Sequence, residues 1–184
     1  MTELRYSQAI GAAKLIASPV TVVTAFDSQS AKTLAMISTV SYAQLEPLTL
    51  SSGVLKKSRT GRAIFESGKF AVSVVAYEQL EKLEKMSLLS AGQDQDKLSA
   101  AGFEKSQFAG SGLEYIKDSL AAFSLKLVGQ VELENYVAII GVVTEAVHLE
   151  DPQASNLRAL IRYNRCYGPI DKDRLKEAID SYPI

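Results

Sequence analysis

The chain has 184 residues, of which 47% are hydrophobic and 22% charged, and its formal net charge at pH 7 is −1. This predicts a single domain over residues 1–184 with a real core, and argues against nucleic acid or an anionic membrane as an obligatory partner. One cysteine, Cys166, and one histidine, His148, exclude a disulfide framework, a Cys/His zinc centre and an iron–sulfur cluster held by cysteines.

The N-terminal stretch predicts an amphipathic helix over residues 5–17. Its apolar positions, such as Ile10 and Ile16, recur at helical spacing, and Ser18-Pro19 ends the pattern. The stretch lacks the basic segment and the continuous apolar run of a secretory signal. No apolar run in the chain approaches the length that spans a bilayer, so we expect no membrane partner. The single cysteine fits the expectation of a cytoplasmic protein.

Three short strands joined by polar turns are predicted between residues 19 and 60. The first covers residues 20–26 and is rich in β-branched and aromatic side chains. The second is one run over 34–42, and the third begins at Leu48, after the break at Glu46-Pro47. The second strand carries three hydroxyls in its last part, from Ser38, Thr39 and Ser41.

Cations and hydroxyls crowd the start of a predicted helix directly after the third strand. The helix covers about residues 59–67, with Ser58 as its N-cap and Gly68 as its stop. The group consists of Lys56, Lys57, Ser58, Arg59, Thr60 and Arg62. Strand hydroxyls followed by such a helix start can hold a polar ring edge and a phosphate together. The alternative is that the hydroxyls lie on a half-buried strand and the cations form a solvated helix face.

The middle of the chain predicts a strand over 69–76, a helix over 77–90 and a polar stretch over 91–112. A helical turn over 96–101 is expected within that stretch, and Phe103 and Phe108 are its large apolar anchors. Such a stretch is either a surface loop or a functional lid.

The C-terminal half predicts a hairpin of two long strands, over 120–133 with a bend at Gly129 and over 136–149. Another strand over 157–163 and a charged helix over 171–181 follow. His148 is interpreted as a surface residue at a strand end, since no Gly-x-Ser-x-Gly elbow accompanies it.

These elements predict a mainly β fold with peripheral helices, in which an antiparallel sheet curls into a small barrel. The strands follow one another too closely for repeated βαβ crossovers, and no Gly-x-Gly-x-x-Gly motif follows a strand. Near the end of the chain, Tyr163, Arg165 and Tyr167 can close a ligand slot or form a surface strand end. Cys166 is expected to be a packed thiol.

Five motifs in order give a family resemblance: PVTVVTAFD, SYAQLEPLTLSSG, KSRT, ESGKFAVSVVAYEQ and LAAFSLKLVGQVELENYVAIIGVV, followed by LIRYNRCYG. They resemble the flavin reductase-like proteins, FMN-binding split barrels that include the reductase components of two-component flavin monooxygenases. The resemblance covers about Pro19 to Gly168.

The resemblance implies a homodimer that binds FMN, or FAD, near the subunit interface and takes electrons from NAD(P)H. It also implies a monooxygenase partner that receives reduced flavin. No side chain need act as an acid or base, since the flavin carries the chemistry. The cofactor-binding residues that it implies are Met36, Ile37, Ser38, Thr39, Ser41, Lys56, Ser58, Arg59 and Thr60. Tyr163 and Arg165, which can close the ligand slot, are added to this set of cofactor-binding residues.

Two departures from the family pattern leave alternatives open. Leu34 and Met36 stand where the family has glycine and threonine, and Tyr136 stands where it has a histidine near the nicotinamide or flavin edge. The Tyr136 departure favours a flavin-binding carrier or sensor without NAD(P)H turnover. The missing hydroxyl at Met36 is the ground for a third hypothesis, a dimeric scaffold without a ligand.

Overall fold

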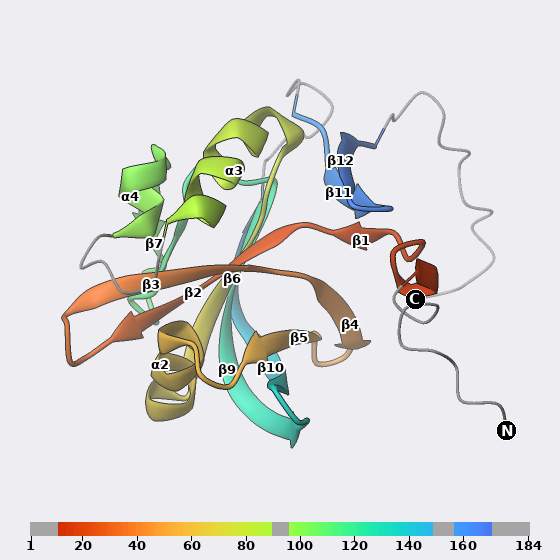
Figure 1. The fold of residues 1–184 in the computed structure, drawn as a ribbon. Helices are drawn as coiled ribbons and strands as arrows, with labels where there is room; N and C mark the ends of the chain where they lie inside the picture. Colours follow the sequence, from red (N-terminus) through yellow and green to blue (C-terminus); the bar gives the residue numbers. More distant parts are fainter. Residues whose placement is uncertain (1–10, 90–95, 149–156, 171–184) are drawn as a thin grey trace, which may run out of the picture.

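A seven-stranded antiparallel sheet forms the centre of the molecule (Figure 1). The structure is a computed structural model that describes residues 11–89, 96–148 and 157–170. The strands follow the order β3-β2-β6-β9-β10-β5-β4 across the sheet. Their bounds are Thr21–Asp27 for β2, Lys32–Ser38 for β3, Val40–Gln44 for β4, Thr49–Leu55 for β5, Lys69–Val74 for β6, Ala121–Glu132 for β9 and Tyr136–His148 for β10. This arrangement confirms the predicted mainly β, antiparallel fold.

The sheet curls because its two edge strands are neighbours in the chain. β3 and β4 lie at opposite ends of the strand order, yet only Thr39 separates them. The single run predicted over 34–42 is therefore wrong: the chain breaks at Thr39, leaves β2 and pairs with β5 instead. Sequence patterning cannot reveal this, because both halves have the composition of a strand.

Strand β2 is buried on both faces, which divides the core in two. Val22 packs into a cluster with Leu83 and Met86, whereas Val23 packs into a second cluster with Ile64. Because successive strand residues point to opposite faces, the continuous apolar run of β2 serves both clusters.

Helices cover the two faces of this part of the sheet (Figure 1). α2, Arg59–Ser67, supplies Ile64 to the second cluster and ends at Gly68, whose φ of 67° gives the left-handed cap. On the other face, the predicted helix over 77–90 is a 3-10 turn, η1, at Tyr77–Gln79, followed by α3, Leu80–Leu88.

The polar stretch after α3 is more ordered than a surface loop. Where it is described, it forms α4, Lys97–Ala101, and a hairpin of β7, Lys105–Gln107, and β8, Glu114–Ile116. The helical turn was predicted, and both Phe103 and Phe108 are buried, as expected of anchors. The hairpin was missed, since three-residue strands carry too little periodicity to detect.

A second, small sheet joins distant parts of the chain. It contains β1, Ser18–Pro19, β11, Leu160–Tyr163, and β12, Cys166–Pro169, in the order β1-β11-β12. The predicted strand over 157–163 corresponds to β11, whereas β12 was missed, because its glycine and proline are typical of turns. The bend predicted at Gly129 is confirmed by a register shift between Leu127 and Gly129 in the β9–β10 pairing.

The predicted terminal helices fall largely outside the described residues. Residues 11–13 are helical and 14–16 form a turn and bend, so the helix ends earlier than the predicted 17, whereas 5–10 and the whole of 171–181 are not described. Within the described part of the chain, no helix is long and apolar enough to cross a membrane.

Candidate functional site

The hydroxyls predicted to meet a ring edge lie where the chain crosses from β3 to β4. Ser38 Oγ lies 2.9 Å from Ser52 Oγ and 2.9 Å from the carbonyl oxygen of Gly53, both in β5. The Ser38 side chain thus ties one edge of the sheet to the strand beside the other edge. Contacts with a ligand at this junction are left to main-chain groups and to the exposed side chains of Thr39 and Ser41.

Met36 and Ile37 turn their side chains into the core. Met36 packs against the cluster that contains Ile64, and Ile37 against the cluster that contains Leu83. β3 is an edge strand of the large sheet, so part of its main chain faces away from β2. These two residues can therefore serve a ligand through their backbone rather than through their side chains.

An open, flat strip lies beside the Ser38 hydroxyl, on the outer side of β5. Gly53 is exposed, and a Cβ placed on it would meet no atom within 4 Å. Its cross-strand neighbour in β10 is Ala138, another small residue, and the next exposed neighbours are Leu55 and Tyr136. A flat surface of small residues bordered by apolar side chains suits a planar ring.

The start of α2 is capped as predicted. Ser58 Oγ accepts a hydrogen bond of 2.9 Å from the Gly61 N–H and donates one of 2.8 Å to the Leu55 carbonyl. Thr60, in the first turn, is buried with 5% of its surface exposed. The first-turn amides of a helix lack intrahelical acceptors, so this end of α2 carries partial positive charge.

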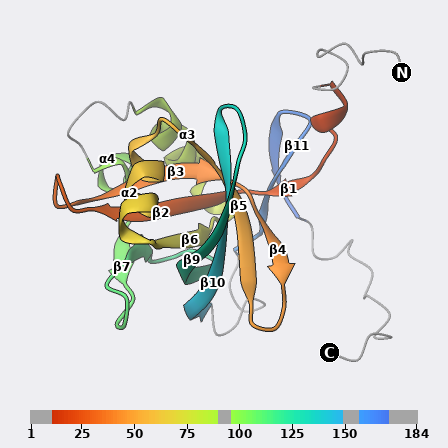
Figure 2. The ribbon, with the colours of Figure 1, turned by 90° about the horizontal axis from the view of Figure 1, so that it is seen from below.

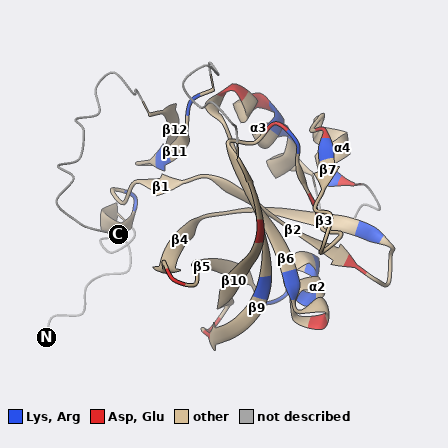
Figure 3. Ribbon diagram, turned by 180° about the vertical axis from the view of Figure 1, so that it is seen from behind, with Lys and Arg blue, Asp and Glu red and all other residues tan. Residues whose placement is uncertain are grey.

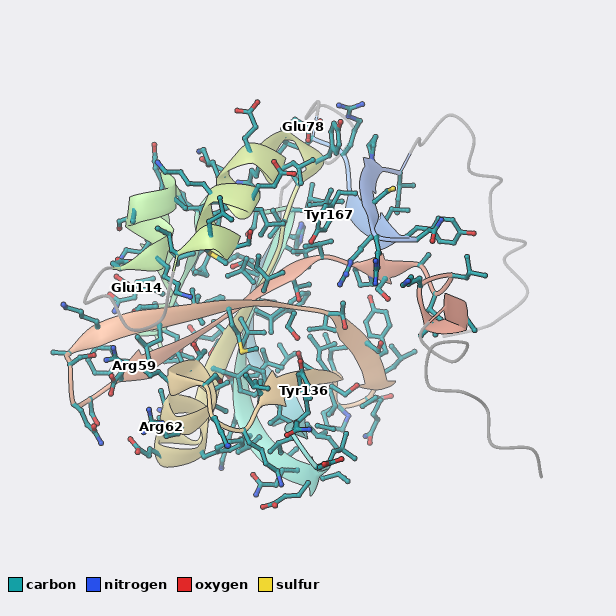
Figure 4. The ribbon with its side chains drawn as sticks, in the orientation of Figure 1. Arg59, Arg62, Glu78, Glu114, Tyr136 and Tyr167 are labelled. Atoms are coloured by element: carbon teal, nitrogen blue, oxygen red, sulfur yellow. The ribbon has the colours of Figure 1, made fainter. Side chains whose placement is uncertain are left out.

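Two of the cations near this helix start are engaged in ion pairs. Arg59 Nη2 lies 3.1 Å from Asp27 Oδ2, and Lys56 Nζ lies 3.0 Å from Glu132 Oε2. Arg62 lies with Arg59 on the same helix and borders the same small hollow as Asp27 (Figure 4). The positive charge predicted here is present, but carboxylates already offset part of it.

Asp27 organises the polar contacts at this end of the sheet. Its carboxylate accepts hydrogen bonds from the Ser30 hydroxyl and the Gln29 N–H as well as from Arg59. The Ser30 hydrogen bond is the largest cause that lowers the pKa of Asp27, and the Gln29 amide and the Arg59 guanidinium lower it further.

Tyr163, Arg165 and Tyr167 lie at the tight β11–β12 turn. Asn164 and Arg165 form the turn with φ values of 49° and 65°, both in the left-handed region. The tyrosines are 48% and 37% exposed, so they are available to a ligand or a partner. Cys166 is exposed, which corrects the expectation of a packed thiol, because a hairpin at the rim of a small sheet offers no core to enter.

A cavity of about 230 Å³ brings Thr39 and Arg165 together. Lys14, Ser18 and Arg162 also line it. Lys14 and Arg162 were missed, and no sequence signal links them, because their proximity depends on the pairing of Ser18 in β1 with Arg162 in β11. The cavity therefore unites two of the predicted site residues with cations from both ends of the described chain.

Tyr136, which stands where the family has a histidine, and His148, the one histidine of the sequence, both lie on β10. Tyr136 begins the strand, is 50% exposed and pairs with Leu55, just before the cationic segment. The Lys56 N–H donates to the carbonyl of Asn135 at 3.1 Å, which ties the two segments together. His148 ends the strand and is exposed, as expected for a surface strand-end residue.

Comparison with known families shows which family the chain belongs to. The family model described as the flavin reductase like domain matches residues 13–171, which is most of the chain. The match includes the β3–β4 junction, α2 and the β11–β12 turn. No curated protein sequence matches the chain at a significant level.

Solved structures share the fold at low sequence identity. The NADH:FAD oxidoreductase SgcE6 of Streptomyces globisporus C-1027 has a TM-score of 0.77 and 16% identity, with 93% of this chain and 96% of that chain covered. Nitrilotriacetate monooxygenase component B from Mycobacterium thermoresistibile has a TM-score of 0.80 and 18% identity, with 95% and 93% covered. The styrene monooxygenase flavin reductase of Pseudomonas putida S12 has a TM-score of 0.71 and 17% identity, with 89% and 97% covered.

Proposed function

The chain belongs to the flavin reductase-like family of oxidoreductases, and we propose that it transfers hydride from NADH or NADPH to FMN bound beside the β3–β4 junction. FAD is the alternative flavin. The observation that carries this placement is the open strip at Gly53, next to the Ser38 hydroxyl. It offers a planar ring a flat surface on one side and main-chain hydrogen-bonding groups at its edge.

The protein's part in this reaction is to bind and orient. The flavin, when bound, supplies the chemistry by accepting hydride at its N5. Main-chain groups of residues 36–39, with Thr39 and Ser41, hold the ring edge. The first turn of α2, with Ser58, Arg59 and Thr60, and the neighbouring Lys56 offset the phosphate charge.

A second copy of the chain completes the proposed assembly. Large apolar side chains are exposed where the end of β5 meets the β9–β10 turn, and this apolar surface consists of Leu55, Val131, Leu133 and Tyr136. Exposed apolar groups gathered in this way are typical of interaction sites. A homodimer through this surface would bring a partner subunit to the edge of the flavin strip.

The recipient of the reduced flavin is, in this proposal, a monooxygenase. The neighbours named as monooxygenase component B and as a styrene monooxygenase flavin reductase support this proposal. We also propose that residues 1–184 form one domain of this family and reside in the cytoplasm, as the single cysteine of the sequence favours.

A flavin carrier or sensor is the second candidate function. Tyr136 favours it, because a phenol at the edge of the flavin strip replaces the imidazole that the family has near the nicotinamide or flavin. In this alternative the chain binds FMN, and neither NADH nor NADPH reduces it.

The first test is the visible absorption spectrum of the protein with FMN, followed by NADH or NADPH under anaerobic conditions. A flavin band that bleaches supports the reductase, whereas a bound flavin band that persists with both donors supports the carrier. An FMN spectrum that the protein does not perturb would contradict both functions.

The second test places the flavin. In Gly53→Val the side chain fills the open strip, so we expect FMN affinity to fall about tenfold or more while the strand remains compatible with a β-branched residue. Gly168→Val, at another glycine with open space around it, is the matched control. Equal FMN affinity in the two variants would contradict the placement of the flavin on this strip.

A further inference from the structure

The cavity beside Thr39 is strongly cationic. Three of its lining residues, Lys14, Arg162 and Arg165, carry positive charge, and no carboxylate of the described residues lines it. Among the described residues, none of the three forms an ion pair. This contrasts with the start of α2, where carboxylates engage Lys56 and Arg59. Three like charges around one hollow repel each other unless an anion joins them.

The cavity is built by specific contacts rather than by mobile surface side chains meeting by chance. The Asn164 N–H donates a hydrogen bond of 2.7 Å to the Lys14 carbonyl, which holds the N-terminal segment against the β11–β12 turn. Arg165 has a φ of 65°, where a glycine would be free of strain. A side chain at such a φ costs backbone strain, and a role for the Arg165 guanidinium in the cavity would account for it.

The place of the cavity fits the second substrate of the reaction better than the flavin. In Figures 1 and 2, β4 and β5 lie between α2 and β11, so the two cationic regions flank the β3–β4 junction on different sides. Figure 3 shows basic colour on β11 and no acidic residue on β1, β11 or β12. If the flavin phosphate lies at α2, an anion in the cavity belongs to another molecule next to the ring.

We propose that this cavity binds a phosphate group of the pyridine nucleotide that reduces the flavin, so that Arg165, expected from the sequence among the cofactor-binding residues, contacts the nucleotide and not the flavin. The inference rests on the proposed function, which requires the nicotinamide to stack on the ring beside Thr39. Arginines are suited to phosphate because they donate paired hydrogen bonds and keep their charge. The phosphate is either the pyrophosphate, common to NADH and NADPH, or the 2′-phosphate, which only NADPH carries.

The test measures nucleotide binding directly, so it does not depend on turnover. NADP⁺ and NAD⁺ are titrated by calorimetry at low ionic strength into the protein, with and without FMN, and FMN affinity is measured separately. Arg162→Gln removes one charge, and Arg165→Gly removes another while relieving the left-handed backbone. Lys85→Ala, an exposed lysine on α3, is the charge-matched control. Circular dichroism melting verifies that each variant is folded.

We expect each arginine variant to weaken nucleotide binding about tenfold, the effect of one lost charged hydrogen bond, while FMN affinity and the control stay unchanged. Loss for NADP⁺ alone assigns the 2′-phosphate, and equal loss for both nucleotides assigns the pyrophosphate. Unchanged nucleotide affinity, no nucleotide binding by the wild type, or weakened FMN binding instead would each overturn the inference. Failure of FMN to bind would contradict the proposed function. The titrations without FMN would still show whether the arginines of the cavity bind the nucleotide.

Discussion

At the residue scale, Asp27 links the turn after β2 to the start of α2. Its carboxylate receives three hydrogen bonds, from Ser30, Gln29 and Arg59, and its pKa is lowered. A carboxyl with a pKa lower in the folded state stabilises the fold above its unfolded pKa, and this contribution disappears as the pH falls through the folded pKa.

We therefore expect Asp27→Asn to lower the free energy of unfolding at pH 7. The difference from the wild type should shrink as the pH falls below about 4, the ordinary pKa range of aspartate. Urea unfolding at pH 7 and pH 3 measures this, with Glu84→Gln, an exposed carboxylate of α3, as the control. A deficit that is equal at both pH values would show that the amide disturbs the turn for reasons other than charge.

Gly61 is a second residue that matters for stability, because one added atom, a Cβ, would disturb the start of α2. A Cβ there would lie 2.9 Å from Ser58 Oγ and 3.0 Å from the Leu55 carbonyl oxygen, so the helix cap would have to shift. Alanine favours a helix over glycine by about 1 kcal/mol, whereas overpacking costs about 1–3 kcal/mol and a lost cap about 1 kcal/mol.

Gly61→Ala should thus be destabilised by about 1–3 kcal/mol, the balance of the overpacking and cap losses against the helix gain. Thermal or urea unfolding measures the change, and Gly168→Ala, which has open space around it, serves as the control. A Gly61→Ala protein as stable as the wild type would mean that the Ser58 cap moves at no cost.

At the element scale, α4 is joined to the β7–β8 hairpin through Asp96. This carboxylate accepts hydrogen bonds from the Leu98 and Ser99 N–H groups, and it also lies 2.6 Å from Lys105 Nζ. Lys105 in turn lies 2.8 Å from Glu114 Oε2 on β8. One helix cap thereby fixes the position of the hairpin that covers this end of the sheet.

Asp96→Ala should lose both the cap and the ion pair, whereas Asp96→Asn keeps a capping oxygen and loses only the charge. We expect a destabilisation of about 1–2 kcal/mol for the alanine variant and a smaller one for asparagine. Chemical denaturation of both variants separates the two contributions. Equal losses would show that the ion pair with Lys105, rather than the cap, holds the element.

At the scale of the whole molecule, the apolar surface around Leu133 is expected to be covered by a second copy of the chain. Val131, on β9, and Leu133, just after the end of β9, are each 55% exposed. Val131→Asp with Leu133→Asp should therefore convert a dimer to a monomer in light scattering. Val147→Asp, at an apolar residue near the other end of the β9–β10 hairpin, should leave the dimer intact. A wild-type monomer at high concentration would contradict the assembly.

Features that depend on neighbouring residues could be predicted from the sequence, whereas features that depend on contacts between distant parts of the chain could not. The long strands β2, β9 and β10, the α2 cap at Ser58 and the bend near Gly129 were predicted, because local composition and periodicity determine them. The break at Thr39 was not, since it reflects a change of strand partner. The strip at Gly53 and the pairing of Lys14 with the β11–β12 turn arise only when distant strands meet.

The pairing of β1 with β11 has a consequence for the order of assembly. Ser38 and Ser52, which tie the edges of the large sheet, are 14 positions apart, whereas β1 and β11 lie near opposite ends of the described chain. Contacts between distant positions close slowly, because the intervening loop must first be ordered. During synthesis, the flavin strip can be complete once β10 has emerged, before the last cations arrive. Refolding should accordingly restore FMN binding before nucleotide binding.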